Sequence, residues 1–249
     1  MKEPLRSKPS IGLDHEPITP PGSRDALQEL RLPLDLLRWA PTWLTTRVRR
    51  AAHPRTVVLL PGFGAGPRSM RLMESSLRRA GHRVRDWGLG QNTGDAKLLR
   101  MRLVSIVEDS RKAHGEPVVL VGWSLGGFIA REYAREHPDH VRKVVTLGTP
   151  VIGGPRYTAT AKWYRSQGHD LDALEQAVAD RYATPLRVPV TAIYSKRDGI
   201  VAWQACIDRW SPNVRHIEVG ETHVGLGFSP RVLAIVMDEV DQRESPGTR

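Results

Sequence analysis

Residues 118 to 127 read Val118-Val119-Leu120-Val121-Gly122-Trp123-Ser124-Leu125-Gly126-Gly127. The first four residues form a continuous apolar run, which is typical of a strand buried on both faces. The glycines on either side of Ser124 permit a sharp turn, and an amphipathic helical pattern follows at 125–137. A strand, a sharp turn and a helix in direct succession predict an α/β fold in which the Ser124 hydroxyl is exposed at the end of a strand.

The same alternation of strand and helix patterns extends from residue 56 to residue 242. Apolar runs predict buried strands at 56–60, 118–121, 143–147 and 190–194, and weaker patterns predict two more at 82–87 and 214–219. Amphipathic segments predict helices at 67–80, 95–114, 125–137, 202–210 and 230–242. We therefore expect about six parallel strands sandwiched by helices.

The first 55 residues precede this alternation and divide into two parts. Residues 1–22 are rich in Pro, Ser and charge and have no hydrophobic period, so we expect a disordered or loosely attached tail. Residues 23–55 predict an amphipathic helical segment, with two short helices divided by Pro33 and Pro41. This segment either packs on the domain surface or contacts lipid, as basic amphipathic helices do.

Residues 56–249 are expected to form one α/β domain, which contains a long excursion at about 151–187. The excursion follows strand 143–147 and has a helical pattern that carries Trp163 and Tyr164. Open α/β sheets bind ligands beyond the carboxyl ends of their strands, where such an insertion would lie. We expect a short helical cap over the site; the alternative is a helix that packs passively on the sheet.

A serine hydroxyl is a poor nucleophile at neutral pH, so Ser124 needs a general base that is itself oriented by an acid. Asp198 follows strand 190–194 and His223 follows strand 214–219, so both belong at the same edge of the sheet as Ser124. We predict that Ser124, Asp198 and His223 form a catalytic triad. The rival carboxylates have other expected places, in the cap or on the polar side of helix 202–210: Asp170, Asp172, Asp180 and Asp208.

An acyl-transfer site also needs N–H groups that stabilise the negative charge on the carbonyl oxygen. The backbone N–H of Leu125 follows the nucleophile, and a second donor is expected from the loop Pro61-Gly62-Phe63-Gly64-Ala65-Gly66. We assign the backbone N–H of Phe63; the alternative is that these glycines only form a strand-to-helix turn. The loop lacks the Gly-Lys-[Ser/Thr] ending of a phosphate-binding loop, which argues against nucleotide binding.

In this order, the features within residues 56–242 resemble the α/β-hydrolase superfamily, in particular its small bacterial esterase and lipase members. Leu147-Gly148-Thr149-Pro150 and Thr222-His223-Val224-Gly225-Leu226 are also similar to lipase-type sequences, whereas Pro61-Gly62 stands where many hydrolases have His-Gly. The resemblance implies an α/β-hydrolase fold with a short helical cap. It also implies a serine esterase that works through an acyl-enzyme and needs no cofactor and no metal.

The same acyl-enzyme would serve a thioesterase or an acyltransferase, and a remote alternative is a binding protein without catalysis on a hydrolase fold. We expect a small-molecule or lipid ester as substrate. Aromatic side chains offer an apolar pocket for its acyl group, and the tentative lining residues are Trp123, Trp163 and Tyr164.

Composition and charge indicate the cellular compartment and the classes of partner. The single cysteine, Cys206, excludes an intramolecular disulfide, and the charged first thirty residues and the absence of a long apolar run predict a cytoplasmic protein. The net charge of +10 comes mostly from arginines spread along the chain. We expect a solvated basic surface, with peripheral contact with anionic membrane as the alternative. No aromatic-interleaved basic motif is present, so no nucleic-acid partner is predicted.

Overall fold

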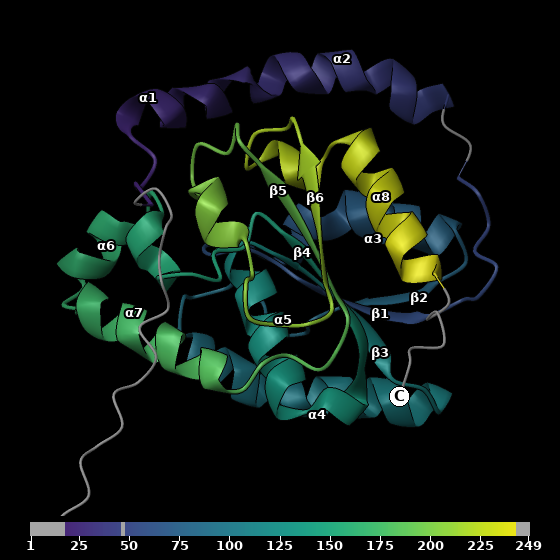
Figure 1. The fold of residues 1–249 in the computed structure, drawn as a ribbon. Helices are drawn as coiled ribbons and strands as arrows, with labels where there is room; N and C mark the ends of the chain where they lie inside the picture. Colours follow the sequence, from purple (N-terminus) through teal and green to yellow (C-terminus); the bar gives the residue numbers. More distant parts are fainter. Residues whose placement is uncertain (1–17, 46–47, 243–249) are drawn as a thin grey trace, which may run out of the picture.

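Six strands form one parallel sheet in the computed structural model, which describes residues 18–45 and 48–242 (Figure 1). The strands are β1 Thr56–Leu60, β2 Arg83–Asp86, β3 Val118–Trp123, β4 Val141–Leu147, β5 Val190–Ser195 and β6 Val214–Val219. Their order in the sheet is β2-β1-β3-β4-β5-β6, and every neighbouring pair is parallel. The predicted fold class, about six parallel strands covered by helices, is confirmed.

The core lies on both faces of the sheet because successive strand residues point to opposite sides. Val57 and Leu59 of β1 pack with α3 (Arg71–Arg79) and α8 (Pro230–Asp241). Val58 and Leu60 pack on the other face with α4 (Ala96–His114) and α5 (Leu125–Glu136). All four side chains are buried, and each such burial contributes roughly 1.5–3 kcal/mol to folding.

The remaining helices are short. They are η2 Pro67–Met70, η3 Pro138–His140, η4 Gly154–Tyr157, α6 Ala161–Ser166, α7 Leu171–Asp180, η5 Arg181–Ala183, η6 Trp203–Cys206 and η7 Gly225–Gly227. Residues 151–187 hold η4, α6, α7 and η5, which lie together at one side of the molecule in Figure 1. The Asp170 side chain accepts hydrogen bonds from the N–H groups of Asp172 and Ala173, and so begins α7.

The predicted helix at 202–210 is wrong, because only the single turn η6 forms there. Asp208 draws the following chain inward instead of lying on the polar side of a helix. Its buried carboxylate pairs with Arg131 and accepts hydrogen bonds from the N–H groups of Trp210 and Ser211. The Asp208 N–H itself donates to the ring of His216 at 3.0 Å. These tertiary contacts use N–H groups that a helix would pair with its own carbonyls, and a carboxylate that a helix would leave on its surface.

An N-terminal segment crosses the molecule above β5, β6 and α8 (Figure 1). It consists of α1 Ser23–Ala26, η1 Leu27–Arg31 and α2 Leu32–Thr45, and α2 packs on α8. The predicted division at the two prolines is wrong. Pro33 lies in the first turn of α2, where a missing N–H costs no helical hydrogen bond, and Pro41 lies inside α2 on its exposed side. Of the expected tail, residues 1–17 lie outside the described residues, as do 46–47 of the segment.

Candidate active site

Ser124 occupies a strained turn between β3 and α5. Its φ and ψ are 53° and −122°, and within residues 18–45 and 48–242 it is the only residue other than glycine with a positive φ. Such a conformation costs on the order of 1–3 kcal/mol and persists where the surroundings hold it. Here the Ser124 N–H donates to the Leu147 carbonyl at 2.8 Å, and the Thr149 hydroxyl donates to the Ser124 carbonyl at 3.0 Å.

The glycines around Ser124 allow β3, α5 and the neighbouring loops to approach closely. A Cβ atom at Gly126 would overlap the carbonyl oxygen of Leu60, and one at Gly127 would overlap the hydroxyl of Thr149. A Cβ atom at Gly122 would in turn collide with the backbone of Gly127. Each of the three glycines around Ser124 is therefore required by a close approach of other atoms. This close packing brings the first turn of α5 directly behind Ser124.

Asp198 and His223 are joined by a short contact. Nδ1 of His223 lies 2.6 Å from Oδ2 of Asp198, and both side chains are buried. The other carboxylate oxygen, Oδ1, accepts the N–H groups of Ile200 at 2.9 Å and Val201 at 2.7 Å. Both oxygens of Asp198 are thus engaged, which fixes the carboxylate relative to the imidazole.

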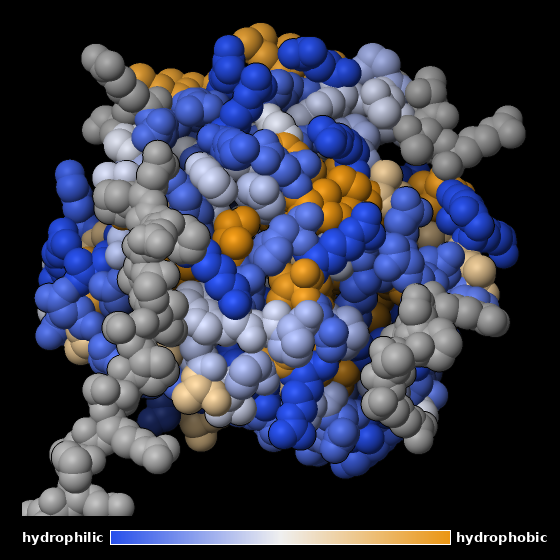
Figure 2. Space-filling view, viewed as in Figure 1, coloured by the Kyte–Doolittle hydropathy of each residue, from blue (hydrophilic) through white to orange (hydrophobic). Residues whose placement is uncertain are grey.

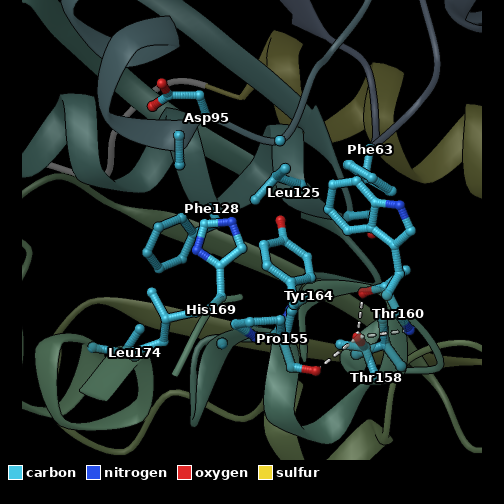
Figure 3. A pocket seen from close by; sticks show the side chains of 18 of the residues that line it. Phe63, Asp95, Leu125, Phe128, Pro155, Thr158, Thr160, Tyr164, His169 and Leu174 are labelled. Atoms are coloured by element: carbon cyan, nitrogen blue, oxygen red, sulfur yellow. Dashed lines mark hydrogen bonds between the residues drawn. The ribbon is translucent and has the colours of Figure 1, made fainter. Parts of the chain in front are cut away.

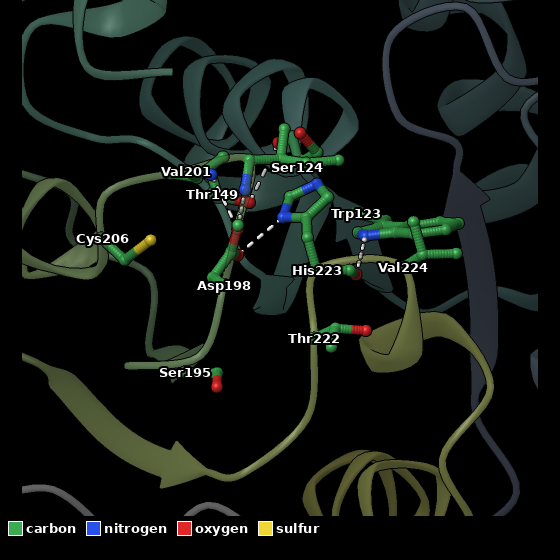
Figure 4. Close-up of polar contacts among 12 residues, drawn as sticks. Trp123, Ser124, Thr149, Ser195, Asp198, Val201, Cys206, Thr222, His223 and Val224 are labelled. Atoms are coloured by element: carbon green, nitrogen blue, oxygen red, sulfur yellow. Dashed lines mark hydrogen bonds and ion pairs between the residues drawn. The ribbon is translucent and has the colours of Figure 1, made fainter. Parts of the chain in front are cut away.

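The His223 ring lies between Asp198 and Ser124 (Figure 4). Burial acts to lower the pKa of His223, but the charge and hydrogen bond of Asp198, together with the charge of Glu29, raise the pKa above its ordinary value. A histidine oriented in this way is suited to accept a proton on the ring nitrogen that does not face the aspartate.

Gly148 provides the space for this pair, which sequence reasoning did not find. Its φ is 53°, and a Cβ atom there would lie 2.9 Å from both Oδ2 of Asp198 and Nδ1 of His223. In the sequence, the signal for this space is Gly148, within the stretch 147–150 that is similar to lipases. Its physical content is a left-handed glycine followed by Thr149, the residue that holds the Ser124 carbonyl.

Two N–H groups are free to face a substrate oxygen at this edge of the sheet. Leu125 is the first residue of α5, so its N–H has no acceptor within the helix. Throughout the described part of the chain, the N–H of Phe63 donates no hydrogen bond to another residue. The Phe63 loop lies close to the serine, since a Cβ atom at Gly62 would be 3.4 Å from Cβ of Ser124.

The Phe63 loop is held in shape by Asn92, a second residue that sequence reasoning missed. Asn92 is completely buried, and its side-chain Nδ2 donates to the Pro61 carbonyl at 2.9 Å. Its backbone exchanges two hydrogen bonds with the loop, to Gly64 and Ala65, each 2.8 Å long. No local pattern announces this role, because the partners lie some thirty residues earlier in the chain.

Ser124 is one of the residues that line a pocket of about 520 Å³. Figure 3 shows this pocket from close by. Its lining includes the side chains of Phe63, Trp163 and Tyr164, whose rings contact one another: Phe63 lies 4.7 Å from Trp163 and 6.0 Å from Tyr164 between centroids. Apolar residues of α5 and α7 also line the pocket, namely Phe128, Leu174 and Val178. The pocket is therefore suited to a hydrocarbon group.

Trp123 does not line this pocket, which corrects one of the three tentative lining residues. As the last residue of β3 it points to the α8 face of the sheet, where its ring packs against Phe228 and Gly227. Its Nε1 donates to the carbonyl of His223 at 3.2 Å. Trp123 thus supports the histidine loop from the side away from the pocket.

The other carboxylates considered from sequence have separate partners. Asp170 begins α7, Asp172 pairs with Arg156, and Asp180 accepts a hydrogen bond from Gln176. Within the ranges that the structure describes, no group of three or more His, Cys, Asp or Glu side chains could hold a metal ion, and no helix is long and apolar enough to cross a bilayer.

Comparison with known sequences gives partial matches to hydrolases. The family model described as alpha/beta hydrolase fold matches residues 55–159. The pimeloyl-[acyl-carrier protein] methyl ester esterase of Vibrio cholerae is 36% identical over 109 residues, 42% of this chain and 41% of that protein. The abhydrolase domain-containing protein lid-1 of Caenorhabditis elegans is 29% identical over 114 residues, 42% of this chain and 32% of that protein. The chain therefore matches less than half the length of these relatives.

Comparison with solved structures covers more of the chain. A metagenome-derived lipolytic enzyme of the LipS and LipT pair matches 78% of this chain and 96% of its own, with a TM-score of 0.62 and 15% identity. The lipase BlEst2 of Bacillus licheniformis covers the same shares, 78% and 96%, with a TM-score of 0.60 and 15% identity. At these identities the likeness concerns the fold. The sheet order, the strained serine turn and these matches together show that the chain has an α/β-hydrolase fold.

Proposed function

We propose that this protein is a serine hydrolase that cleaves carboxylic esters with an apolar acyl group, using Ser124, His223 and Asp198. The observation that carries the proposal is the 2.6 Å contact between His223 and Asp198 beside the strained Ser124 turn. The esterase named among the similar proteins, which matches 42% of this chain, supports the same class of reaction.

In the proposed reaction, Oγ of Ser124 attacks the ester carbonyl carbon while His223 accepts the hydroxyl proton. The Asp198 carboxylate stabilises the imidazolium that forms. The negative charge on the former carbonyl oxygen is stabilised by the N–H groups of Leu125 and Phe63, which have no competing partner among the described residues.

The tetrahedral intermediate then collapses, the bond to the alcohol breaks, and His223 gives its proton to the departing alcohol oxygen. An acyl group remains on Ser124. His223 next accepts a proton from water, whose oxygen attacks the acyl carbon through the same oxyanion site. The carboxylic acid leaves and the proton returns to Ser124, so no cofactor enters the balance.

The acyl group is proposed to occupy the pocket formed by Phe63, Trp163 and the wall of α5 and α7. Each CH₂ group moved from water into such a site gains about 0.8 kcal/mol. We therefore expect kcat/KM for p-nitrophenyl esters to rise from acetate to octanoate, and Trp163→Ala to flatten that rise. Trp203→Ala is the matched control, because Trp203 stacks on Tyr194 outside the pocket. A preference for acetate would contradict an apolar acyl site.

The function itself is tested by comparing wild type with Ser124→Ala. We expect wild type to hydrolyse p-nitrophenyl butyrate and to be labelled by a fluorophosphonate, and Ser124→Ala to do neither while unfolding at a similar temperature. Labelling without hydrolysis of any oxygen ester would favour thioester hydrolysis or acyl transfer. If wild type is not labelled, a binding role without catalysis becomes the better explanation.

A second proposal is that the outer face of the N-terminal segment contacts anionic lipid. Four leucines point outward at helical spacing and are 59–72% exposed: Leu27, Leu30, Leu34 and Leu37. Exposed Arg31 and Arg38 lie among them, so an apolar stripe is combined with positive charge. Figure 2 shows hydrophobic atoms at the upper edge of the molecule, where Figure 1 places this segment. Basic amphipathic helices of this kind bind in the interface of anionic membranes.

Sedimentation with phosphatidylglycerol vesicles tests this contact. We expect wild type to bind in low salt, and the double change Leu30→Glu, Leu37→Glu to abolish binding. The matched control is Leu98→Glu, Met101→Glu, because these exposed apolar residues lie on α4 at the opposite side of the molecule. Equal binding by both double variants would contradict the proposal. If the leucines instead hold two copies of the chain together, their change will halve the mass measured by ultracentrifugation.

A further inference from the structure

One carboxylate of the N-terminal segment reaches both loops that carry the proposed acid and base. Oε1 of Glu29 accepts the N–H of Gly199 at 3.0 Å and the N–H of His223 at 2.8 Å, and Oε2 accepts the N–H of Val224 at 2.9 Å. Gly199 directly follows Asp198 in the chain. Glu29 therefore binds the acid loop and the histidine loop at the same time, from more than 160 residues away.

The backbone of the segment is close enough to these loops for the contact to be specific. A Cβ atom at Gly199 would overlap the carbonyl oxygen of Asp25, one turn before Glu29. On the histidine loop, a Cβ atom at Gly225 would lie 3.2 Å from the ring of Trp39. Both loops thus present a glycine where the segment crosses them, and Trp39 anchors the segment beyond Glu29.

The contacts of Glu29 continue into the Asp198–His223 pair. The acid loop is held from one side by Asp198, whose Oδ1 accepts the N–H of Val201, and from the other by Glu29 at Gly199. The histidine is held at its ring by Asp198 and at its backbone by Glu29. Hydrogen bonds from N–H groups to a carboxylate are about twice as strong as those to a neutral acceptor. Beyond the paired ends of β5 and β6, the two loops are thus tied to each other both by the Asp198–His223 contact and through Glu29.

We propose that Glu29 is a positioning residue of the catalytic site: its carboxylate sets the distance between the acid loop and the histidine loop. This inference rests on the proposed function of Ser124, Asp198 and His223. Glu29 is not among the residues that line the pocket, so it acts on the rate of the chemical step and not on substrate binding. The N-terminal segment is on this account a part of the active site.

A purely structural tie and a positioning role differ in electrostatics. The negative charge of Glu29 is one of the groups that raise the pKa of His223. Glu29→Gln keeps the size of the side chain and one acceptor oxygen but removes the charge, and it places an NH₂ group against a backbone N–H. It is therefore expected to lower the pKa of His223 as well as to loosen the two loops.

Turnover of p-nitrophenyl butyrate as a function of pH provides the first test. For Glu29→Gln we expect kcat to fall by about 10- to 100-fold, since a misplacement of about 1 Å can cost on the order of 100-fold. KM should stay within about twofold, and the acidic limb of the profile should move to lower pH. Asp35→Asn is the matched control, because it removes one carboxylate from the same segment but is not among the charges that act on His223. It should leave kcat and the limb unchanged.

Two further measurements keep the inference testable if turnover is lost or folding is weakened. In a Ser124→Ala background, the pKa of the His223 ring is followed by NMR, assigned by its absence in His223→Gln; we expect a lower value with Glu29→Gln. Trp39→Ala leaves Glu29 in place but removes the anchor of the segment, and should reduce kcat with little change in KM. Wild-type kcat in both variants, or an unchanged His223 pKa, would overturn the proposal. A wild type that is not labelled by a fluorophosphonate would instead refute the proposed function, and the NMR result would still stand by itself.

Discussion

A methyl group at Gly148 would lie 2.9 Å from Nδ1 of His223, closer than packed carbon and nitrogen atoms approach. The same methyl group would be equally close to the carboxylate of Asp198. Gly148, which directly follows β4, therefore leaves the space that Asp198 and His223 occupy. A search for reactive side chains does not detect this contribution.

Gly148→Ala should for this reason reduce kcat by about 100-fold or more, because the Asp198–His223 pair must shift to make room. Gly115→Ala is a matched control. Both glycines have a positive φ, 53° and 66°, so both changes introduce a similar strain of about 1 kcal/mol, but nothing lies within 4 Å of a Cβ atom at Gly115. The measurement is ester turnover together with thermal unfolding. Equal activity in the two variants would show that the pair tolerates a methyl group.

Asn92→Ala should weaken stabilisation of the oxyanion. It removes the hydrogen bond to the Pro61 carbonyl from a completely buried site, and an unsatisfied buried group costs about 1–3 kcal/mol. We expect kcat to fall by about 10- to 100-fold as the Phe63 N–H moves, with binding of the alcohol product unchanged. Gln91→Ala is the control at the neighbouring residue, since Gln91 is exposed and its side chain donates to the carbonyl of Gly64. The proposed role fails if the two variants lose activity equally.

The pH dependence of kcat/KM should report the raised pKa of His223. The ring must be neutral to accept the serine proton, so activity is lost as pH falls through this pKa, and the limb should lie above the ordinary histidine value of 6.5. Asp198→Asn removes the strongest group that raises the pKa and should move the limb to lower pH. It should also reduce kcat by as much as about 10⁴-fold. His140→Gln should leave the limb in place, because its ring contacts Tyr133 away from the site.

Stability should depend on Asp208 in acid. Burial acts to raise the pKa of this carboxyl, but Arg131 and backbone hydrogen bonds lower it from 3.8 to about 2. Because the folded value is the lower one, the contribution is complete above pH 4 and is lost as pH falls towards 2; it amounts to roughly 2 kcal/mol. Urea unfolding at pH 5 and pH 2.5 measures it. In Asp208→Asn this pH dependence should be smaller, and stability at pH 5 lower by about 3–5 kcal/mol because Arg131 stays buried without its partner.

The parts of the fold that sequence predicts well are those with a local cause. Strands buried on both faces must be apolar along their whole length, so the run 56–60 agrees with β1 at both ends. The turn at Ser124 is partly local, since Gly122 and Gly127 approach each other across it, although Gly126 and Gly127 also make room for Leu60 and Thr149.

Errors arise where a distant contact competes with a local pattern. Residues 202–210 have an amphipathic pattern, but the buried ion pair of Asp208 and Arg131 stabilises a chain that turns inward. The aromatic character of Trp123 predicts a place in the pocket, whereas the alternation of side chains along β3 directs it to the opposite face. The sequence gives no local signal for Glu29, since a glutamate in an amphipathic segment is usually a solvent-exposed side chain. Its role depends on three backbone N–H groups that lie far away in the chain.

The contact between Glu29 and His223 also orders events in time. After Glu29 has been added to the growing chain, 194 more residues must be added before His223, whose N–H binds that carboxylate, exists. Contacts of such sequence separation are slow to form, because the entropy of closing the intervening loop is lost before any contact is gained. The nucleophile turn can form earlier, because the last residue in the chain that holds it is Thr149. A nascent chain would therefore carry a shaped but inactive serine site until its histidine loop has been made.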